Sequence, residues 1–268
     1  MAHAENELLR LAHLNHAEFC REMGRWSGHD GVVEERYGML LWRTATPFPV
    51  VLNAGVRLYP GDAGSALDAA DDFFADRGGS YSLILSERDG ADDDLAEQAT
   101  ARGFMAFDPE PEMVRRTPVD ERPAPSGIEV RWVDDVAGVA DFVAVSDAAY
   151  QSLGLPAGVI TATVTAPERL LEPHLHTVVA YDDNRPVAAA QTLLSHGIAG
   201  VFFVGVIPDA RGRGLADLVT RAATNRGFSA GAEILSLQAT AMGEPVYRKM
   251  GWESVYDYRG MARFGSLT

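Results

Sequence analysis

The sequence predicts an α/β protein made of two similar halves that follow one another along the chain. Apolar positions recur at strand-like and helix-like spacings along the whole length, which is typical of mixed α/β proteins. Three prolines within eight residues, from Pro118 to Pro125, interrupt this pattern near the middle. We therefore expect a domain at 1–116, a proline-rich linker at 117–126 and a second domain at 127–268.

The first half begins with a helix and continues as short strands and two further helices. Leu8, Leu11 and Phe19 recur at helical spacing near the start of the chain. Runs rich in strand-forming residues, bounded by turn residues, follow them. We expect strands at 32–37, 39–43, 50–59 and 81–85 and after Gly103, and helices at 65–77 and 92–102.

The second half has a similar order of elements. The segment 182–185 is typical of a turn between two antiparallel strands, and an irregular or helical stretch leads to Pro173. We expect strands at 128–132, 176–181, 187–194, 200–206 and 234–239 and from Trp252 onward, and helices at 136–150, 214–226 and about 245–250.

The two halves also share a register, because four pairs of identical residues are each separated by 148 positions. Each pair falls at an equivalent element boundary, which indicates an ancient duplication. Coincidence is the alternative, since glycine is common after any helix. The pairs are Pro60 and Pro208, Gly79 and Gly227, Gly103 and Gly251, and Met113 and Met261.

Composition excludes several kinds of function. The 38 acidic and 23 basic residues give a formal charge of −15, so we expect no nucleic acid and no membrane among the partners. Cys20 is the sole cysteine, so no disulfide framework or cysteine-rich zinc site is expected, and no metal is predicted. Lys249 is the sole lysine and is not followed by Ser or Thr, which excludes a P-loop.

The location expected from the sequence is the cytoplasm. The first ten residues carry two glutamates and no apolar core, unlike a signal peptide. No apolar run approaches the roughly 20 residues that a membrane-spanning helix needs. Scarce lysine beside abundant Ala, Gly, Asp and Arg is typical of a GC-rich bacterial genome.

A glycine loop between a strand and a helix is the most informative segment. An apolar strand stops at Pro208, Gly212 and Gly214 follow, and an amphipathic helix then begins. Such a loop leaves backbone N–H groups unpaired at the positive end of the helix dipole, which suits a phosphate or pyrophosphate. Arg211 and Arg213 add local positive charge.

Two other interpretations of this loop are open from the residues alone. A dinucleotide-binding fingerprint needs a third glycine where Asp217 stands, so that site is disfavoured. The loop could also be a plain turn that leads the chain into its helix.

A second motif lies shortly after the 234–239 strand. Tyr247 sits on a short helix that Gly251 ends, and Trp252 starts the next strand. Arg211-x-x-Gly214-x-Ala216 followed by Tyr247-x-x-x-Gly251-Trp252 resembles the signature motifs of the GCN5-related N-acetyltransferase (GNAT) superfamily. The resemblance extends to the element order over about 127–265.

The resemblance implies both a fold and an activity. The fold is two tandem GNAT units of the α/β (α+β) class, each with a mixed, mostly antiparallel central sheet flanked by helices. The activity is transfer of an acetyl group from acetyl-CoA to an amine of a small-molecule acceptor, by direct attack in a ternary complex. The chain would act as a monomer or homodimer.

The resemblance also assigns residues to the site. Tyr247 takes the position of the general acid that protonates the departing thiolate, which suits a phenol with an ordinary pKa of about 10; the alternative is a packing tyrosine. The strand that ends at Val206 would splay from its neighbour and receive the pantetheine arm, and the loop amides would hold the pyrophosphate. Thr240 replaces a common asparagine. The cofactor-binding residues are Val204, Gly205, Val206, Arg211, Gly212, Arg213, Gly214, Leu215, Ala216, Asp217 and Thr240.

The base that would take the proton of the amine is not fixed by these motifs. The 200–206 strand carries no carboxylate, where many family members have one. The candidates near the expected acceptor side are Glu172, His174, His176 and His196, each of which is also an ordinary solvated residue. Cys20 is a poor candidate for a nucleophile.

The first half resembles a degenerate copy of the GNAT unit. Ala63, Gly64 and Ser65 stand where the second half has its arginine- and glycine-bearing loop, and Ala99 stands in place of Tyr247. We expect this half to wall one side of the acceptor cleft without binding the cofactor. A catalytically silent acyl-CoA-binding sensor or interaction module is the alternative function, since it would need the loop but not Tyr247.

Overall fold

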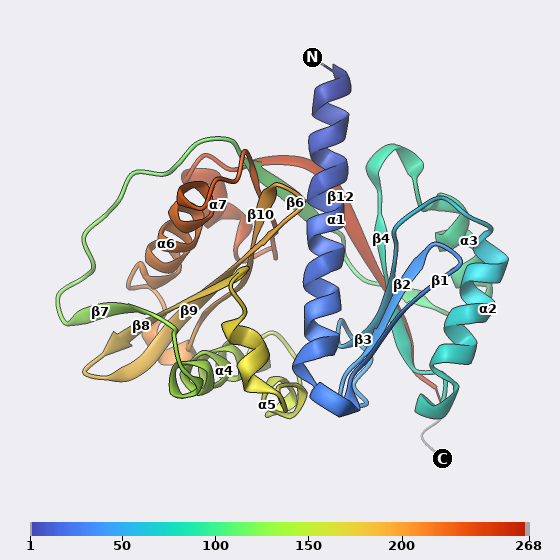
Figure 1. Cartoon of the computed structure of the whole chain (residues 1–268), viewed down its shortest axis with the longest axis horizontal. Coiled ribbons are helices and arrows are strands. Elements are labelled where there is room, and N and C mark those ends of the chain that lie inside the picture. Colours follow the sequence, from blue (N-terminus) through green and yellow to red (C-terminus); the bar gives the residue numbers. More distant parts are fainter. Residues whose placement is uncertain (1, 266–268) are drawn as a thin grey trace.

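The computed structural model describes residues 2–265, and the strands in this range form one twisted, mostly antiparallel sheet (Figure 1). Along the sheet the strands follow the order β1-β2-β3-β4-β12-β6-β11-β10-β9-β8-β7, with β5 paired to β12. Helices cover both faces, as expected for the predicted α/β class.

The first half follows the predicted element order with shifted ends. The helix expected at 65–77 begins earlier and is α-helical only to Phe73, before a short 3-10 turn at Ala75–Arg77. The strand expected at 50–59 is shorter, because residues 50–52 form a turn with Val51 at φ 51°. The elements are α1 (Ala2–Trp26), β1 (Val32–Arg36), β2 (Met39–Arg43), β3 (Asn53–Arg57), α2 (Ala63–Phe73), β4 (Tyr81–Ser86), α3 (Asp93–Ala101), β5 (Met105–Ala106) and β6 (Glu110–Arg115).

The second half matches the predicted elements closely. The turn at 182–185 carries Asp183 and Asn184 at positive φ, as a tight hairpin requires. The elements are β7 (Ile128–Trp132), α4 (Val136–Gln151), α5 (Val159–Thr163), β8 (Leu175–Asp182), β9 (Arg185–Ser195), β10 (Ile198–Val206), α6 (Leu215–Ser229), β11 (Leu235–Gln238), α7 (Glu244–Lys249) and β12 (Glu253–Arg263).

The two halves repeat one topology. In the first, β1, β2 and β3 are antiparallel, and β4 joins β3 in parallel after the crossover helix α2. In the second, β8, β9 and β10 are antiparallel, and β11 joins β10 in parallel after α6. The N-terminal half is therefore a second copy of the same unit.

The last strands of the two copies are exchanged. β6, from the first half, pairs with β11 of the second half. β12, from the second half, pairs with β4 of the first. The two exchanged strands pair with each other at the centre of the sheet. Each copy therefore completes the sheet of the other.

The segment between the halves is irregular but fixed in place. Residues 116–127 form no helix or strand, and the backbone of Val119 exchanges two hydrogen bonds with the Asn225 side chain, at 3.0 and 2.9 Å. The Arg221 guanidinium donates to the Asp120 carbonyl at 2.8 Å. Both partners belong to α6, so the segment lies along that helix.

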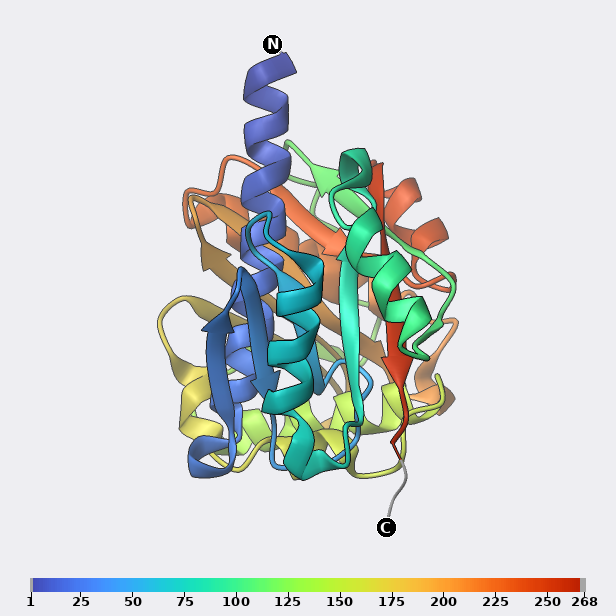
Figure 2. The same cartoon turned by 90° about the vertical axis from the view of Figure 1, so that its right-hand side faces the viewer.

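The helices divide between the two faces of the sheet. α1 crosses one face along the middle of the molecule (Figure 1), where Asn15 faces Gly200 of β10. The neighbouring Ala199 faces Gly227 of α6, so α6 covers the opposite face. On the first half, α2 and α3 lie over the strands seen from the side (Figure 2) and bury a second core. Among residues 2–265, no helix is long and apolar enough to cross a membrane.

Candidate active site

An opening between β10 and β11 lies at the centre of the second half. The two strands pair only at Ala199 with Leu235 and at Gly200 with Ser236, and then diverge. A bulge after Phe202 bends β10 away, and the following residue adopts φ 50°. Residues 204–206 therefore form one edge of the opening, and residues 237–238 form the other.

The glycine loop presents free backbone donors at the start of α6. Gly212 and Gly214 both adopt φ 77°, and a Cβ on either would meet nothing within 4 Å, so backbone conformation and not crowding favours glycine there. Gly214 caps the helix with no side chain, and the first helical bond runs from the Leu218 amide at 3.1 Å. The amides of residues 212–217 donate to no group within 2–265. Free amides at a helix N-terminus are able to bind an anion.

The two loop arginines differ from the sequence-based expectation, because both are engaged within the protein. Arg211 donates to the Ser152 hydroxyl and to the Ala149 carbonyl at 3.4 Å, at the end of α4. Arg213 pairs with Asp182 in the β8–β9 turn at 2.6 Å. Their charges stabilise the ends of neighbouring elements and fix the loop.

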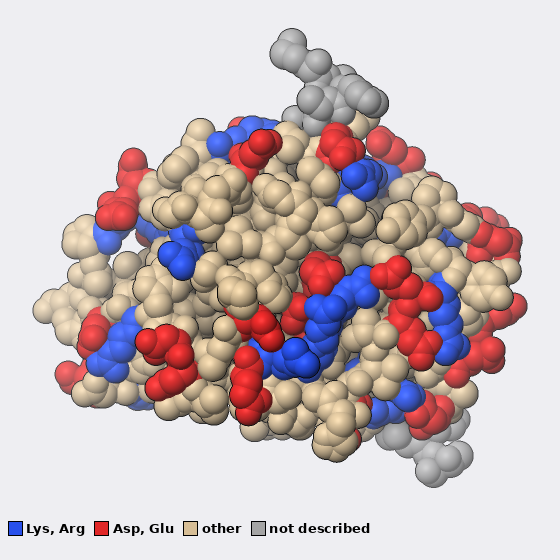
Figure 3. Space-filling view, viewed as in Figure 1, with Lys and Arg blue, Asp and Glu red and all other residues tan. Residues whose placement is uncertain are grey.

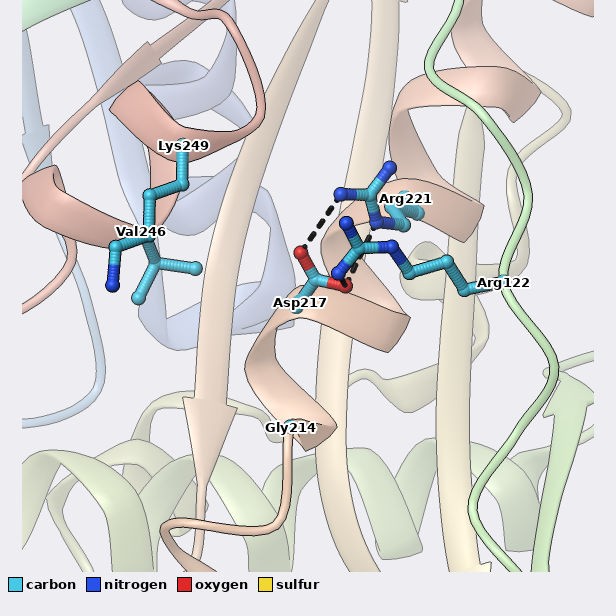
Figure 4. Close-up of a pocket in the computed structure, with 6 residues that line it drawn as sticks. All are labelled: Arg122, Gly214, Asp217, Arg221, Val246 and Lys249. Carbon is cyan, nitrogen blue, oxygen red and sulfur yellow. Dashed lines mark hydrogen bonds and ion pairs between the residues drawn. The ribbon is translucent and has the colours of Figure 1, made fainter.

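A pocket of about 310 Å³ beside the loop also carries positively charged side chains (Figure 4). In the close-up, the Asp217 carboxylate points toward Arg221 and Arg122, while Lys249 lies on the α7 side. The Asp217 carboxylate accepts two hydrogen bonds from the Arg221 guanidinium, at 2.8 and 3.0 Å, and lies 3.5 Å from the Arg122 guanidinium. Two arginines thus pair with the Asp217 carboxylate, and Lys249 lines the pocket from the α7 side. The pocket is lined by Arg122, Gly214, Asp217, Arg221, Val246 and Lys249.

Three of these residues were not predicted from the sequence as site residues. Arg221 could have been found from its i+4 spacing to Asp217, which is the spacing of a helical ion pair. Lys249 was recognised only as the single lysine. No sequence signal places Arg122, because its position depends on how the interdomain segment lies along α6.

Tyr247 projects from α7 with only 7% of its surface exposed. Its ring packs over Gly243, where an added Cβ would lie 2.8 Å from the ring, and near Trp252, with centroids 6.4 Å apart. Its hydroxyl forms no hydrogen bond with any residue in 2–265. Burial and the charge of Glu110 raise its pKa, so the phenol keeps its proton. Tyr247 therefore combines a packing role with an available donor.

Two further groups lie within electrostatic reach of Tyr247. Burial, Tyr247 and Glu110 together raise the pKa of Tyr150, at the end of α4. Glu110, the first residue of β6, is exposed, yet desolvation raises its pKa. Protein atoms therefore surround much of the Glu110 carboxylate, while part of it remains accessible to solvent. Neither residue stands out as a site residue in the sequence.

The remaining predicted residues have local partners. Thr240 accepts from the Gly243 amide through its hydroxyl at 3.2 Å, which fixes the turn into α7. Leu215, the first residue of α6, is buried. Among the base candidates, Glu172 lies 3.4 Å from Arg169, His174 lies 3.3 Å from Glu22, His176 lies 3.3 Å from Arg226, and His196 lies 3.1 Å from the Ser195 hydroxyl. Across 2–265, no group of three acidic, His or Cys side chains could hold a metal ion.

The equivalent site in the first half is closed. β3 and β4 pair at three successive positions, from Ala54 with Ser82 to Val56 with Ile84, without an opening. The start of α2 is capped by the Asp62 carboxylate, which accepts from the Ser65 amide at 2.8 Å. A carboxylate thus occupies the place that the uncapped Gly214 leaves free.

Comparisons with known proteins bear on the family and the fold. Residues 145–252 match the acetyltransferase (GNAT) family model. A GCN5-related N-acetyltransferase from Kribbella flavida superposes with a TM-score of 0.68 at 19% identity, covering 93% of this chain and 96% of that one. Another from Sphaerobacter thermophilus has a TM-score of 0.61 at 14% identity, with 89% and 82% covered. No curated protein matches the sequence.

A tandem protein has the same overall arrangement. A tandem GNAT protein from the clavulanic acid biosynthesis pathway superposes with a TM-score of 0.56 at 9% identity, covering 90% of this chain and 85% of that one. At these identities the likeness concerns the fold, and it extends over both halves.

Proposed function

Since its second half carries an acetyltransferase domain of the GNAT family, we propose that this protein transfers an acetyl group from acetyl-CoA to an amine of a small molecule. The observation that carries the proposal is the uncapped loop at Gly214, which adjoins both the β10–β11 opening and the cationic pocket. An elongated anion with a thioester at one end and phosphates at the other fits these three features together.

In this proposal each part of acetyl-CoA is held by a different feature of the site. The free amides of residues 212–217 would hold the pyrophosphate. Arg122, Arg221 and Lys249 would hold the phosphate-bearing nucleotide end. The backbone of Val204, Gly205 and Val206 follows β9 on one side and has no β11 partner on the other, and that free side would receive the pantetheine arm as an added strand.

Tyr247 supplies the proton for the leaving group in this proposal. Its phenol keeps its proton at neutral pH because burial and a nearby carboxylate raise its pKa. Its hydroxyl has no competing partner in residues 2–265. A thiolate departing from the thioester would take that proton.

Direct attack by the amine suits this site better than an acyl-enzyme on cysteine. Cys20 is fully buried in α1, and burial raises the pKa of its thiol, so it does not form a thiolate readily. The acceptor and acetyl-CoA would therefore be bound together. We propose a small amine as the acceptor and a monomer or homodimer as the acting form.

The experiment is to titrate the protein with acetyl-CoA by calorimetry and to assay acetyl transfer to a panel of small amines. Binding with transfer to at least one amine supports the proposal. Binding without transfer would favour an acyl-CoA-binding sensor. Absence of binding would exclude both.

A further inference from the structure

The Glu110 carboxylate is exposed and has no hydrogen-bond or ion-pair partner among the described residues. It stands at the start of the exchanged strand β6, whose pairing with β11 continues past Gln238 through a bond from the Ala239 amide to the Pro111 carbonyl at 3.0 Å. Glu110 is therefore level with Thr240, where the turn into α7 begins. The N-terminal half thus places a free carboxylate beside the opening of the C-terminal half.

Glu110 and Tyr247 approach this opening from opposite faces of the sheet. Glu110 is directly opposite Tyr258 on β12, and Tyr258 contacts His13 of α1 at 2.8 Å, so Glu110 is on the α1 face. Arg115, on the alternate face of β6, donates to the Met250 carbonyl just after α7 at 2.6 Å, so α7 covers the other face. Tyr247 belongs to that helix.

We infer that Glu110 is the base that receives the proton of the acceptor, and that the acceptor is an alkyl amine that arrives as an ammonium ion. This inference rests on the proposed function. A free carboxylate on the face opposite the proton donor can attract the ammonium and orient it toward the thioester. On the α1 face, acidic and basic side chains are intermixed (Figure 3), so a local group and not a broad field would select the cation.

Glu112, two residues further along the same face, cannot do this. It is fully buried, accepts from the Gln238 side chain, and burial raises its pKa to about 8, so it holds its proton at neutral pH. Desolvation also raises the pKa of Glu110, but Glu110 is exposed and unpaired, so a bound amine can reach its carboxylate. Groups with shifted pKa values on the elements around Glu110 include Tyr247 of α7, Tyr150 of α4, Tyr256 and Tyr258 of β12, Glu112 of β6, and His13 and His16 of α1.

The reaction balances with these two groups. The ammonium gives one proton to the Glu110 carboxylate, and the freed nitrogen lone pair forms a bond to the thioester carbonyl carbon. The C–S bond then breaks, and its electron pair leaves on sulfur, which takes the Tyr247 proton. The second nitrogen proton restores the Tyr247 phenol, and Glu110 releases its proton to water. The products are the amide, free CoA and one proton.

The test compares Glu110→Gln with the wild type on two classes of acceptor. Lysine and spermidine are alkyl amines, protonated at neutral pH because the pKa of such an amine is about 10.4. Hydroxylamine is largely neutral there and needs no base. Asp257→Asn is the matched control, because Asp257 lies on the neighbouring strand opposite Pro111, so its side chain is on the other face.

Glu110→Gln should lower kcat/KM for the alkyl amines roughly a hundredfold at pH 7, within the usual range of general-base contributions. The loss should shrink as the pH approaches the pKa of the amine, and hydroxylamine transfer should change little. Calorimetry should show unchanged acetyl-CoA affinity but weaker binding of spermidine to the CoA-bound protein. Asp257→Asn should match the wild type in every measurement.

Three results would overturn the inference. Equal rates for Glu110→Gln and wild type with the alkyl amines would remove Glu110 from the reaction while leaving the proposed function intact. An equal loss with hydroxylamine would indicate a structural role. Failure of the wild type to acetylate either class would reject the proposed function itself, and the base with it.

Discussion

Met113 and Met261 occupy each other's place in the sheet. Met113, from the first half, pairs with Leu237 on β11 and is buried in the main core. Met261, 148 residues later, pairs with Leu83 on β4 and is buried beneath α2 and α3. Because each half supplies a strand to the other, the two halves share one sheet, although the sequence suggests a domain boundary between them.

Because the strands are exchanged, we expect the halves to unfold together. Leu83→Ala in one core and Leu237→Ala in the other should each lower stability by about 2–5 kcal/mol, since both side chains are buried. Differential scanning calorimetry should show both variants shifting one common transition. Two transitions, with each variant moving a different one, would contradict this expectation.

The loop prediction can be tested with two glycines at opposite ends of α6. Gly214→Glu places a carboxylate at the free amides and should weaken acetyl-CoA binding roughly tenfold or more, because it competes with the pyrophosphate. Gly231 has φ 94° and open space, as Gly214 has, so Gly231→Glu introduces similar strain away from the site. Calorimetry should show unchanged affinity for the Gly231 variant. Equal affinities for the two variants would reject the loop as the site.

The pocket prediction concerns the nucleotide end of acetyl-CoA. Lys249→Gln should weaken binding roughly tenfold, as expected for loss of a charge-assisted hydrogen bond. The effect should vanish with acetyl-3′-dephospho-CoA if Lys249 contacts the 3′-phosphate. Arg248→Gln is the control, because Arg248 pairs with Glu244 at 2.6 Å and does not line the pocket. A Lys249 variant that binds acetyl-CoA like the wild type would place the nucleotide elsewhere.

Tyr247→Phe should lower kcat roughly ten- to a thousandfold and leave acetyl-CoA affinity nearly unchanged, since it removes a proton donor but keeps the ring. The raised pKa of Tyr247 means that its protonated form persists above pH 10, so this group should cause no fall in kcat between pH 7 and 9. Steady-state kinetics of the variant and of Tyr59→Phe, an exposed tyrosine of the first half, provide the measurement. Unchanged kcat would assign Tyr247 to packing alone.

The sequence predicted the elements well because each carries its own periodicity and boundary residues. The strand at 128–132 was found with its observed ends, and Gly214 and Gly251 marked helix ends correctly. The strand exchange was not predictable in this way. β6 and β12 carry equivalent methionines and similar alternation, and nothing in a single strand specifies which copy supplies its neighbour.

The features of the candidate site that depend on local backbone conformation could be predicted from the sequence. Those that depend on contacts between distant residues could not. The Gly212–Gly214 loop is local, so its free amides could be inferred from sequence. The partners of Arg211 and Arg213 lie 62 and 31 positions away, so their engagement could not. Glu110 lies in the stretch after Gly103, where the sequence predicted only a strand, and the exchange of β6 brings it near Tyr247.

The last prediction is that each chain binds about one acetyl-CoA, in the second half alone. Two features of the first half oppose binding: the Asp62 carboxylate already accepts from the Ser65 amide at the start of α2, and β3 and β4 remain paired where β10 and β11 diverge. Asp62→Gly would remove the first obstacle but not the second, because a paired strand edge has no free backbone for the pantetheine arm. Calorimetry should therefore give about one site per chain for both the wild type and Asp62→Gly. A second site in the wild type would contradict closure of the first copy, and a second site only in the variant would show that the capping carboxylate alone blocks it.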